Sequence, residues 1–280
     1  MNKIFILGGS GLLGKYLIRH FLSKNFEVGS LSRHDNEVSL GCLNYQVDIL
    51  DYTKLEPLIA KYDIIINCTG QITNPISDCI MLNTQGIQNI INAVKKHKKY
   101  LIHFSTVAVY GSSLTTATEE SKINPESVYG AIKYFAEYQI KQNLASCAIL
   151  RISNLYSKDQ TKGVFGYLLR SFYNDEKKLY FNNNGSLKRY YLHIDDLSNI
   201  VSEVLKKELH GIYNVIGNDF ITIKELIAYF EKVLNYSFKV QYDNNKPIEN
   251  IVSIDNSKLT KEINYSFNKS IDKYLEELSE

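Results

Sequence analysis

A short apolar run that breaks into evenly spaced glycines constrains the fold of this chain more than any other feature. Lys3–Leu7 is almost entirely apolar, and Gly8, Gly11 and Gly14 follow at intervals of three residues. Glycine permits a tight turn, lets a backbone approach a ligand, and allows a helix to pack closely on a strand. The N-terminus of the next helix adds N–H donors and positive potential. The spacing therefore predicts a strand, a turn and a helix that hold the pyrophosphate of a dinucleotide.

Short apolar runs alternate with longer helical patterns over the first two thirds of the chain. Strands are expected at Lys3–Leu7, Phe26–Leu31, Asn44–Val47, Asp63–Asn67, Tyr100–Phe104 and Cys147–Arg151, and helices over about 12–24, 52–60, 76–97 and 126–143. This alternation predicts an α/β fold, a Rossmann-type doubly wound parallel sheet.

After Arg151 the pattern becomes irregular, with helices expected over about 195–207, 222–235 and 270–278. Ligands of such sheets bind at the carboxyl ends of the strands, so the later segments predict a small C-terminal substrate-binding lobe over that edge. We expect residues 1–156, with returning segments about 188–216, to form the dinucleotide-binding domain. Residues 157–280 are expected to form the interleaved lobe.

Composition argues against several other classes of protein. The net charge is +2, and the four cysteines have no CxxC spacing and no nearby histidine pair, which argues against zinc and disulfides. The basic stretch Lys95–Lys99 follows a helical pattern, where cations suit the helix dipole better than a nucleic acid. No apolar run approaches the roughly 20 residues of a membrane span, and the first run is too short for a signal peptide. We expect a soluble cytoplasmic protein with no metal, nucleic-acid partner or membrane insertion.

The second expected strand leads into Ser32 and Arg33, which bear on the choice of cofactor. An acidic residue there would bind the adenosine ribose hydroxyls and repel a 2′-phosphate. A hydroxyl and a guanidinium instead match phosphate in charge and geometry. If Arg33 is merely solvated and Asp35 acts as the acid, NAD(H) is favoured. We expect NADP(H), with NAD(H) as the alternative.

Tyr129 and Lys133 lie one helical turn apart in the helix expected after the fifth strand. Tyrosine is a poor base at its ordinary pKa of about 10, and an ammonium on the same helix face would lower that pKa. The hydroxyl of Thr106, at the end of the fifth strand, can hydrogen-bond a substrate oxygen. The set predicts proton transfer on a carbonyl or alcohol beside a nicotinamide. His103, within that apolar strand, is expected to be a core residue rather than a catalyst.

Taken in order, these motifs resemble the extended short-chain dehydrogenase/reductases, the sugar-nucleotide epimerase, dehydratase and reductase group. The similarity continues through Asn83–Asn89, Phe104–Gly111, Leu150–Tyr156, Gly185–Asp196, Gly211–Val215 and Asp255–Lys258. It implies catalytic roles for Thr106, Tyr129 and Lys133. The expected cofactor contacts are Gly8, Ser10, Gly11, Leu12, Leu13, Gly14, Ser32, Arg33, Asp48, Ile49, Cys68, Thr69, Gly70, Asn83, Tyr129, Lys133 and Ser153. The expected substrate contacts are Thr106, Asn154 and Arg189.

Departures from the family pattern narrow the expected activity. The family's 4,6-dehydratases carry Asp-Glu after the catalytic threonine, whereas Val107 and Ala108 stand here and cannot transfer protons. Ser157 replaces a glycine, and Tyr190 replaces an aspartate. The small lobe and Arg33 favour an NADPH-dependent reductase of a nucleotide-activated 4-keto-6-deoxy sugar in deoxysugar and surface polysaccharide biosynthesis.

Two alternatives stay open: an NAD-dependent nucleotide-sugar 4-epimerase and a non-catalytic NADP-sensing protein. The family usually dimerises through the helices matching 76–97 and 126–143, so a homodimer is expected.

Overall fold

Seven parallel strands form the central sheet. The computed structural model describes residues 3–33, 41–71, 74–112, 116–243 and 253–279. The sheet has the order β10-β6-β5-β4-β1-β2-β3, and every neighbouring pair is parallel. Its strands are β1 (Lys3–Leu7), β2 (Glu27–Ser32), β3 (Leu43–Gln46), β4 (Ile64–Asn67), β5 (Tyr100–Thr106), β6 (Cys147–Ile152) and β10 (Gly211–Val215). The predicted doubly wound α/β fold is thus confirmed, and β10 adds an edge strand that the sequence did not predict.

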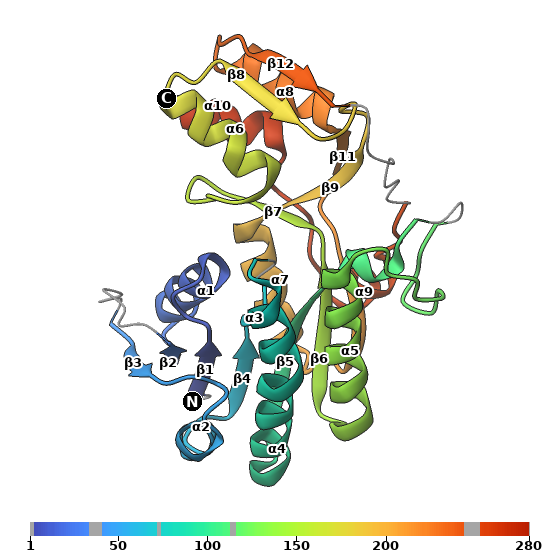
Figure 1. Cartoon of the computed structure of the whole chain (residues 1–280). Coiled ribbons are helices and arrows are strands. Elements are labelled where there is room, and N and C mark those ends of the chain that lie inside the picture. Colours follow the sequence, from blue (N-terminus) through green and yellow to red (C-terminus); the bar gives the residue numbers. More distant parts are fainter. Residues whose placement is uncertain (1–2, 34–40, 72–73, 113–115, 244–252, 280) are drawn as a thin grey trace.

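Helices cover both faces of this sheet, which explains why its strands are apolar on both sides (Figure 1). One face carries α1 (Leu12–Ser23) and α7 (Ile194–Lys206), and the other carries α2 (Tyr52–Ile59), α4 (Ile87–His97) and α5 (Val128–Asn143). Along β1, Ile4 and Ile6 belong to one core while Phe5 and Leu7 belong to the other, as the two-residue period of a strand requires. The helix expected over 76–97 is α3 (Ile76–Met81), a π-helical turn (Leu82–Gly86) and α4 in succession.

A smaller lobe lies over the carboxyl ends of the parallel strands (Figure 1). Its helices are α6 (Gly163–Tyr173), α8 (Ile223–Val233) and α10 (Ile271–Ser279). Three strands, β7 (Asn154–Tyr156), β9 (Lys188–His193) and β11 (Asp219–Thr222), form one small sheet, and β8 (Lys178–Phe181) pairs with β12 (Lys239–Tyr242). The lobe has its own apolar core, with Phe165 and Phe230 packed edge to face. The chain returns to the large sheet through α7 and β10, and again through α9 (Ser257–Glu262), which packs on β10.

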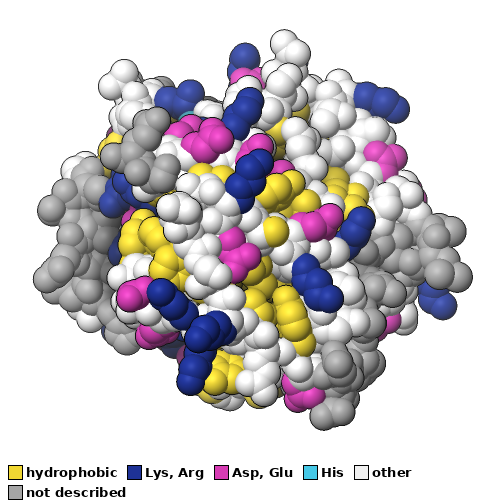
Figure 2. Space-filling view, turned by 90° about the horizontal axis from the view of Figure 1, so that it is seen from above, with side chains coloured by type: hydrophobic (Ala, Val, Ile, Leu, Met, Phe, Trp, Pro, Cys, Tyr) yellow, Lys and Arg dark blue, Asp and Glu magenta, His cyan; other side chains and the backbone are white. Residues whose placement is uncertain are grey.

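Figure 2 views the molecule from the side of the small lobe. Lys and Arg side chains are interspersed there with Asp and Glu, and hydrophobic side chains gather between them. Within the described part of the chain, no helix combines the length and hydrophobicity that a membrane span requires.

Candidate active site

A cavity of about 710 Å³ lies between the carboxyl ends of the large sheet and the small lobe. Of the residues expected to bind cofactor, all but Asn83 and Lys133 line it. The expected substrate residues Thr106, Asn154 and Arg189 line it as well. Asn83 and Lys133 are instead buried behind its wall. The sequence motifs, which are up to 181 residues apart between Gly8 and Arg189, therefore meet in one space.

The glycine turn after β1 has the backbone geometry that a close ligand needs. Gly8 has a φ of +86°, and its N–H and that of Gly9 donate to the Leu31 carbonyl at 2.8 and 3.1 Å. A Cβ atom on Gly14 would lie 2.3 Å from the Gly8 carbonyl oxygen, so α1 can approach the turn only without a side chain there. Helix α1 begins at Leu12, which puts its unpaired N–H groups at the cavity. This turn fits a dinucleotide pyrophosphate.

At the end of the cavity beyond the glycine turn, the side chain of Arg33 is paired with a carboxylate. Arg33 follows β2, and its guanidinium lies 3.3 Å from the Asp78 carboxylate, which comes from α3. Both side chains are more than a third exposed, so water screens the pair. Asp48 lines the same region and accepts a 2.9 Å hydrogen bond from the Leu50 N–H. The alternative acid, Asp35, lies outside the described residues.

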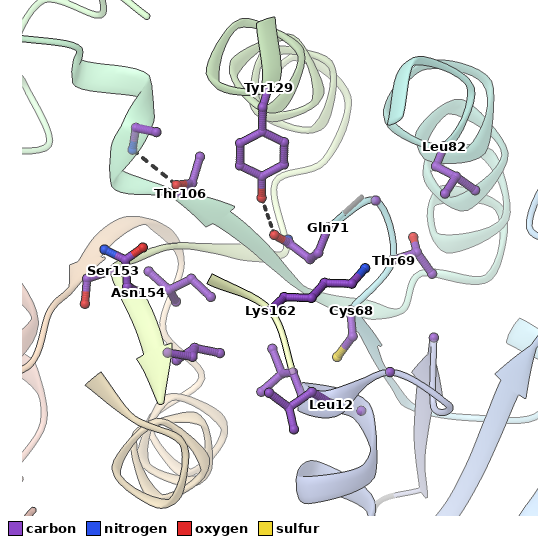
Figure 3. Close-up of a pocket in the computed structure, with 18 of the residues that line it drawn as sticks. Leu12, Cys68, Thr69, Gln71, Leu82, Thr106, Tyr129, Ser153, Asn154 and Lys162 are labelled. Carbon is purple, nitrogen blue, oxygen red and sulfur yellow. Dashed lines mark hydrogen bonds between the residues drawn. The ribbon is translucent and has the colours of Figure 1, made fainter. Parts of the chain in front are cut away.

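Tyr129 points into the cavity from the first turn of α5 (Figure 3). Ser127 caps that helix by accepting from the Gly130 N–H at 3.1 Å. The Tyr129 hydroxyl donates to the Gln71 side-chain carbonyl, and the Gln71 amide in turn donates to the Phe104 carbonyl at 3.0 Å. Gln71 was not predicted; it directly follows Cys68, Thr69 and Gly70, which were expected to contact the cofactor, but no sequence pattern pointed to it. Thr106 faces the same space from the end of β5.

Lys133 lies one turn after Tyr129 and is completely buried. Its ammonium nitrogen is 3.2 Å from Asn83 Oδ1 and 3.3 Å from His103 Nε2. Burial lowers the pKa of Lys133 to about 8, although the Glu137 carboxylate opposes that shift. Burial also raises the pKa of Tyr129 above its ordinary value. The expectation that Lys133 lowers the tyrosine pKa is therefore wrong for this arrangement, because desolvation of the phenol outweighs any effect of the Lys133 charge.

A buried ion pair supports the helix that carries Tyr129 and Lys133. The Arg151 guanidinium, on β6, binds the Glu137 carboxylate of α5 at 2.7 Å, and both side chains are 2% exposed. Arg151 also donates to the Tyr110 hydroxyl at 2.8 Å, and that hydroxyl donates to Asn214 at 2.6 Å. Ser105 donates to the other side of the carboxylate. These contacts tie α5 to the ends of β5, β6 and β10.

The lobe side of the cavity presents two cations and an amide. Lys162, which precedes α6, reaches into the cavity toward Thr69 (Figure 3), and Arg189 lines it from β9. The Asn154 amide donates to the Tyr190 carbonyl at 3.3 Å. A second cavity of about 440 Å³ shares Asn154, Lys162 and Arg189 with the first and extends into the lobe between α6, β8 and β9. Lys162 was not predicted, since nothing marks it among the chain's lysines.

Tyr190 and Ser157, the two residues that differ from the family pattern, have distinct surroundings. Tyr190 stacks on Phe220 with ring centroids 4.2 Å apart, and its hydroxyl accepts from the Ile254 N–H at 3.2 Å. Ser157 is completely buried, and its hydroxyl finds no hydrogen-bond partner among the described residues. Tyr190 therefore braces β9 against β11.

Comparison with known proteins places the chain in a family. The sequence profile of the NAD dependent epimerase/dehydratase family matches residues 4–216. The chain belongs to this family, which corresponds to the extended short-chain dehydrogenase/reductases, and is an NAD(P)-dependent enzyme of the oxidoreductase type.

Its relatives carry several activities. A dTDP-D-glucose 4,6-dehydratase of Dictyostelium discoideum is 29% identical over 275 residues, which cover 85% of this chain but only 62% of the relative's length. A putative UDP-glucose 4-epimerase of Methanocaldococcus jannaschii is 26% identical over 270 residues (88% and 86% of the two chains). A dTDP-4-dehydro-6-deoxyglucose reductase of Escherichia coli is 27% identical over 265 residues (84% and 82%).

A solved structure has the same fold. The UDP-glucuronic acid 4-epimerase of Bacillus cereus, in complex with UDP-glucuronic acid and NAD, superposes with a TM-score of 0.86 at 23% identity and covers 99% of both chains.

Proposed function

We propose that this protein is an NADPH-dependent reductase of a nucleotide-activated 4-keto-6-deoxy sugar, acting in the cytoplasm in deoxysugar and surface polysaccharide biosynthesis. One observation carries the proposal: a single cavity joins the glycine turn to Tyr129 and Thr106, and continues to Asn154 and Arg189. Residues 1–156 would hold the dinucleotide, and residues 157–280 most of the substrate.

The residues present fit a dinucleotide. The turn at Gly8 and Gly14 leaves room for a pyrophosphate, which a side chain at either position would disturb. Ser153 lines the cavity with a buried hydroxyl that has no partner in the described part of the chain, so a ligand group can satisfy it. When bound, NADPH would supply the hydride that reduces the substrate carbonyl carbon.

The chain's own residues would supply the proton and the orientation. Thr106 would donate a hydrogen bond to the C4 carbonyl oxygen and orient it. Tyr129 would give its hydroxyl proton to the same oxygen as the alcohol forms, since burial keeps this phenol protonated at neutral pH. Lys133, completely buried one turn after Tyr129, would return a proton to the Tyr129 phenolate. The net change is one hydride and one proton added to a carbonyl.

Dehydration is disfavoured by the residues beside Thr106. Val107 and Ala108 line the cavity where elimination of a sugar hydroxyl needs an acid and a base. The likeness to a 4,6-dehydratase therefore supports the substrate class, a nucleotide-activated sugar, rather than the reaction.

The second candidate is an NAD-dependent 4-epimerase, which would use the same Thr106, Tyr129 and Lys133. The ion pair between Arg33 and Asp78 favours it, because a carboxylate that holds the guanidinium competes with a 2′-phosphate for it. The likeness to the putative Methanocaldococcus epimerase supports an epimerase as strongly as the likeness to the Escherichia coli reductase supports a reductase.

The substrate's diphosphate would lie between the cations of the lobe, Lys162 and Arg189, with its nucleoside in the second cavity. A homodimer is proposed through α3 and α5, because most of the large apolar side chains exposed in the described part belong to these helices: Ile76, Ile80, Met81, Val128, Tyr134, Phe135 and Tyr138. Ala136 and Ile140 of α5 are buried instead against the sheet.

Titration calorimetry of NADPH against NADH tests the cofactor choice on wild type, Arg33→Ala and Asp78→Asn. A charge-assisted hydrogen bond to the 2′-phosphate is worth about 1.5–3 kcal/mol, so Arg33→Ala should weaken NADPH binding roughly 10- to 100-fold and leave NADH unchanged. Asp78→Asn should strengthen NADPH binding, and Arg19→Ala, whose side chain lies on α1 away from the cavity lining, should change neither. Tight NAD retained through purification would instead support the epimerase.

A further inference from the structure

A chain of buried side chains connects the cavity wall to Lys133. Asn67 Oδ1, at the end of β4, accepts from the Thr69 N–H at 3.0 Å and from the Thr69 hydroxyl at 2.6 Å. Asn67 Nδ2 lies 3.1 Å from His103 Nδ1, and His103 Nε2 lies 3.3 Å from Lys133 Nζ. Asn67, His103 and Lys133 are fully buried, so water cannot replace any of these partners.

The hydrogen-bonding capacities of these groups assign the proton positions. A backbone N–H can only donate, so the Asn67 atom that faces the Thr69 N–H must be the carbonyl oxygen. The amide nitrogen of Asn67 then donates to His103, which makes His103 Nδ1 an acceptor without a proton. A neutral imidazole carries one proton, and in His103 that proton must be on Nε2.

His103 therefore directs an N–H at Lys133. An ammonium has three donors and no acceptor, so a charged Lys133 would place N–H against N–H. A neutral amine fits, because its lone pair accepts from His103. Lys133 can still donate to Asn83 Oδ1 at 3.2 Å, since the Asn83 amide nitrogen is committed to the carbonyl oxygens of Gly70 and Cys79.

We propose that His103 is a positioning residue that favours the neutral amine of Lys133 over the ammonium and couples the protonation of Lys133 to the segment Asn67–Thr69 at the cavity wall. When Lys133 gains a proton, the imidazole proton must move from Nε2 to Nδ1 so that Nε2 accepts. The Asn67 amide must then turn over and give up both hydrogen bonds from Thr69. Because Thr69 lines the cofactor side of the cavity, occupancy of that side and the proton on Lys133 would influence each other.

The groups around Lys133 are consistent with this coupling. Glu137 acts on it from α5, Cys79 from α3, Cys68 from the residue after β4, and His103 contacts it from β5. Tyr129 lies one turn earlier on α5, with its hydroxyl directed to Gln71. Glu137 favours the charged form, but Arg151 already neutralises that carboxylate. Burial, together with Lys133, lowers the pKa of His103 well below its ordinary value, so the imidazole stays neutral.

Nuclear magnetic resonance of protein labelled with ¹⁵N-histidine tests the assignment without any turnover. The six histidines give separate ring signals, and the signal lost in His103→Gln identifies His103. The expected result is an Nε2–H tautomer above pH 8 and a change of its ring nitrogen shifts as Lys133 is protonated, which is absent in Lys133→Met. An Nδ1–H tautomer at high pH, or shifts that do not depend on Lys133, would overturn the proposal.

The pH dependence of NADPH binding tests the coupling. In His103→Leu the N–H that opposes the ammonium is gone, so the proton-linked midpoint should rise by about one pH unit. His103→Gln, which can present an amide N–H to Lys133, should stay near wild type, and the buried His193→Gln controls for loss of an imidazole elsewhere. An unmoved midpoint in folded His103→Leu would refute the coupling; if that variant does not fold, the tautomer of the wild type decides.

This inference rests on the proposed function only for the catalytic role of Lys133. A protein that reduces no nucleotide sugar but shows the Lys133-dependent titration of His103 would lose the proposed function and keep the coupling.

Discussion

Replacing Glu137 by alanine should destabilise the fold by breaking the ion pair beneath the active site. The Glu137 carboxylate receives three contacts from the Arg151 guanidinium, Nε at 3.1 and 3.2 Å and Nη2 at 2.7 Å. A guanidinium does not lose its proton in proteins, and Arg151 is 2% exposed. Its charge would therefore remain buried without a carboxylate. Removing one partner of such a pair costs about 3–5 kcal/mol.

That cost translates into a measurable shift in Tm. Unfolding entropy of about 2.1 cal/mol/K per residue amounts, over 280 residues, to about 0.6 kcal/mol/K. A loss of 3–5 kcal/mol should therefore lower the Tm by about 5–9 °C. The hydrogen bond that Arg151 donates to the neutral Tyr110 hydroxyl would not replace the lost carboxylate.

Differential scanning calorimetry on a matched set of variants measures this shift. Glu27→Ala removes an exposed partner of Lys3 and should change stability by less than about 1 kcal/mol. The double variant Glu137→Met/Arg151→Met removes both charges and should be more stable than Glu137→Ala. If Glu137→Ala melts within 1 °C of Glu27→Ala, the buried pair is not what anchors α5.

Three further predictions follow from single contacts. Gly14→Ala should reduce NADPH affinity by at least about tenfold in calorimetry, because its Cβ would meet the Gly8 carbonyl at 2.3 Å; wild-type affinity would show that the turn tolerates the side chain. Burial lowers the pKa of His20 to about 4, whereas the unfolded chain has about 6.5, so the unfolded state binds more protons as pH falls from 6.5 to 4. The Tm should drop over that window, less in His20→Gln than in wild type, and equal drops would contradict this. Phe135→Asp should give a monomer by light scattering if the exposed apolar face of α5 joins two copies, and a dimer that survives the charge would place the interface elsewhere.

Local patterns predicted most of the large sheet. Strand β1 has the predicted ends because its apolar run stops at Gly8, where φ is positive. Strand β10 was missed because Gly211–Val215 lies in an irregular region and gains its place only by pairing with β6, some 60 residues earlier. Helix α6 was missed because it begins with Gly163 and contains Gly166, and glycine disfavours a helix. A Cβ on Gly166 would lie 2.7 Å from the Gln160 carbonyl, so that glycine serves packing.

The site residues likewise fall into two groups, those that a sequence motif predicted and those that no motif marks. Residues within motifs, such as Gly8 and Tyr129, were placed at the cavity by their distance from a strand end. Gln71 and Asp78 act through partners that are remote in sequence, Tyr129 and Arg33, and no local pattern encodes such contacts. His103 is buried as predicted, yet its contact with Lys133 depends on how α5 packs against β5.

The most direct test of the proposed function is consumption of NADPH in the presence of dTDP-4-dehydro-6-deoxyglucose, followed by the loss of NADPH absorbance. The wild type should consume one NADPH for each sugar reduced. Tyr129→Phe should bind NADPH normally and consume none, because the proton donor is missing. Interconversion of UDP-glucose and its 4-epimer by protein that retains NAD, with no net consumption of NADPH, would contradict the reductase and establish the epimerase.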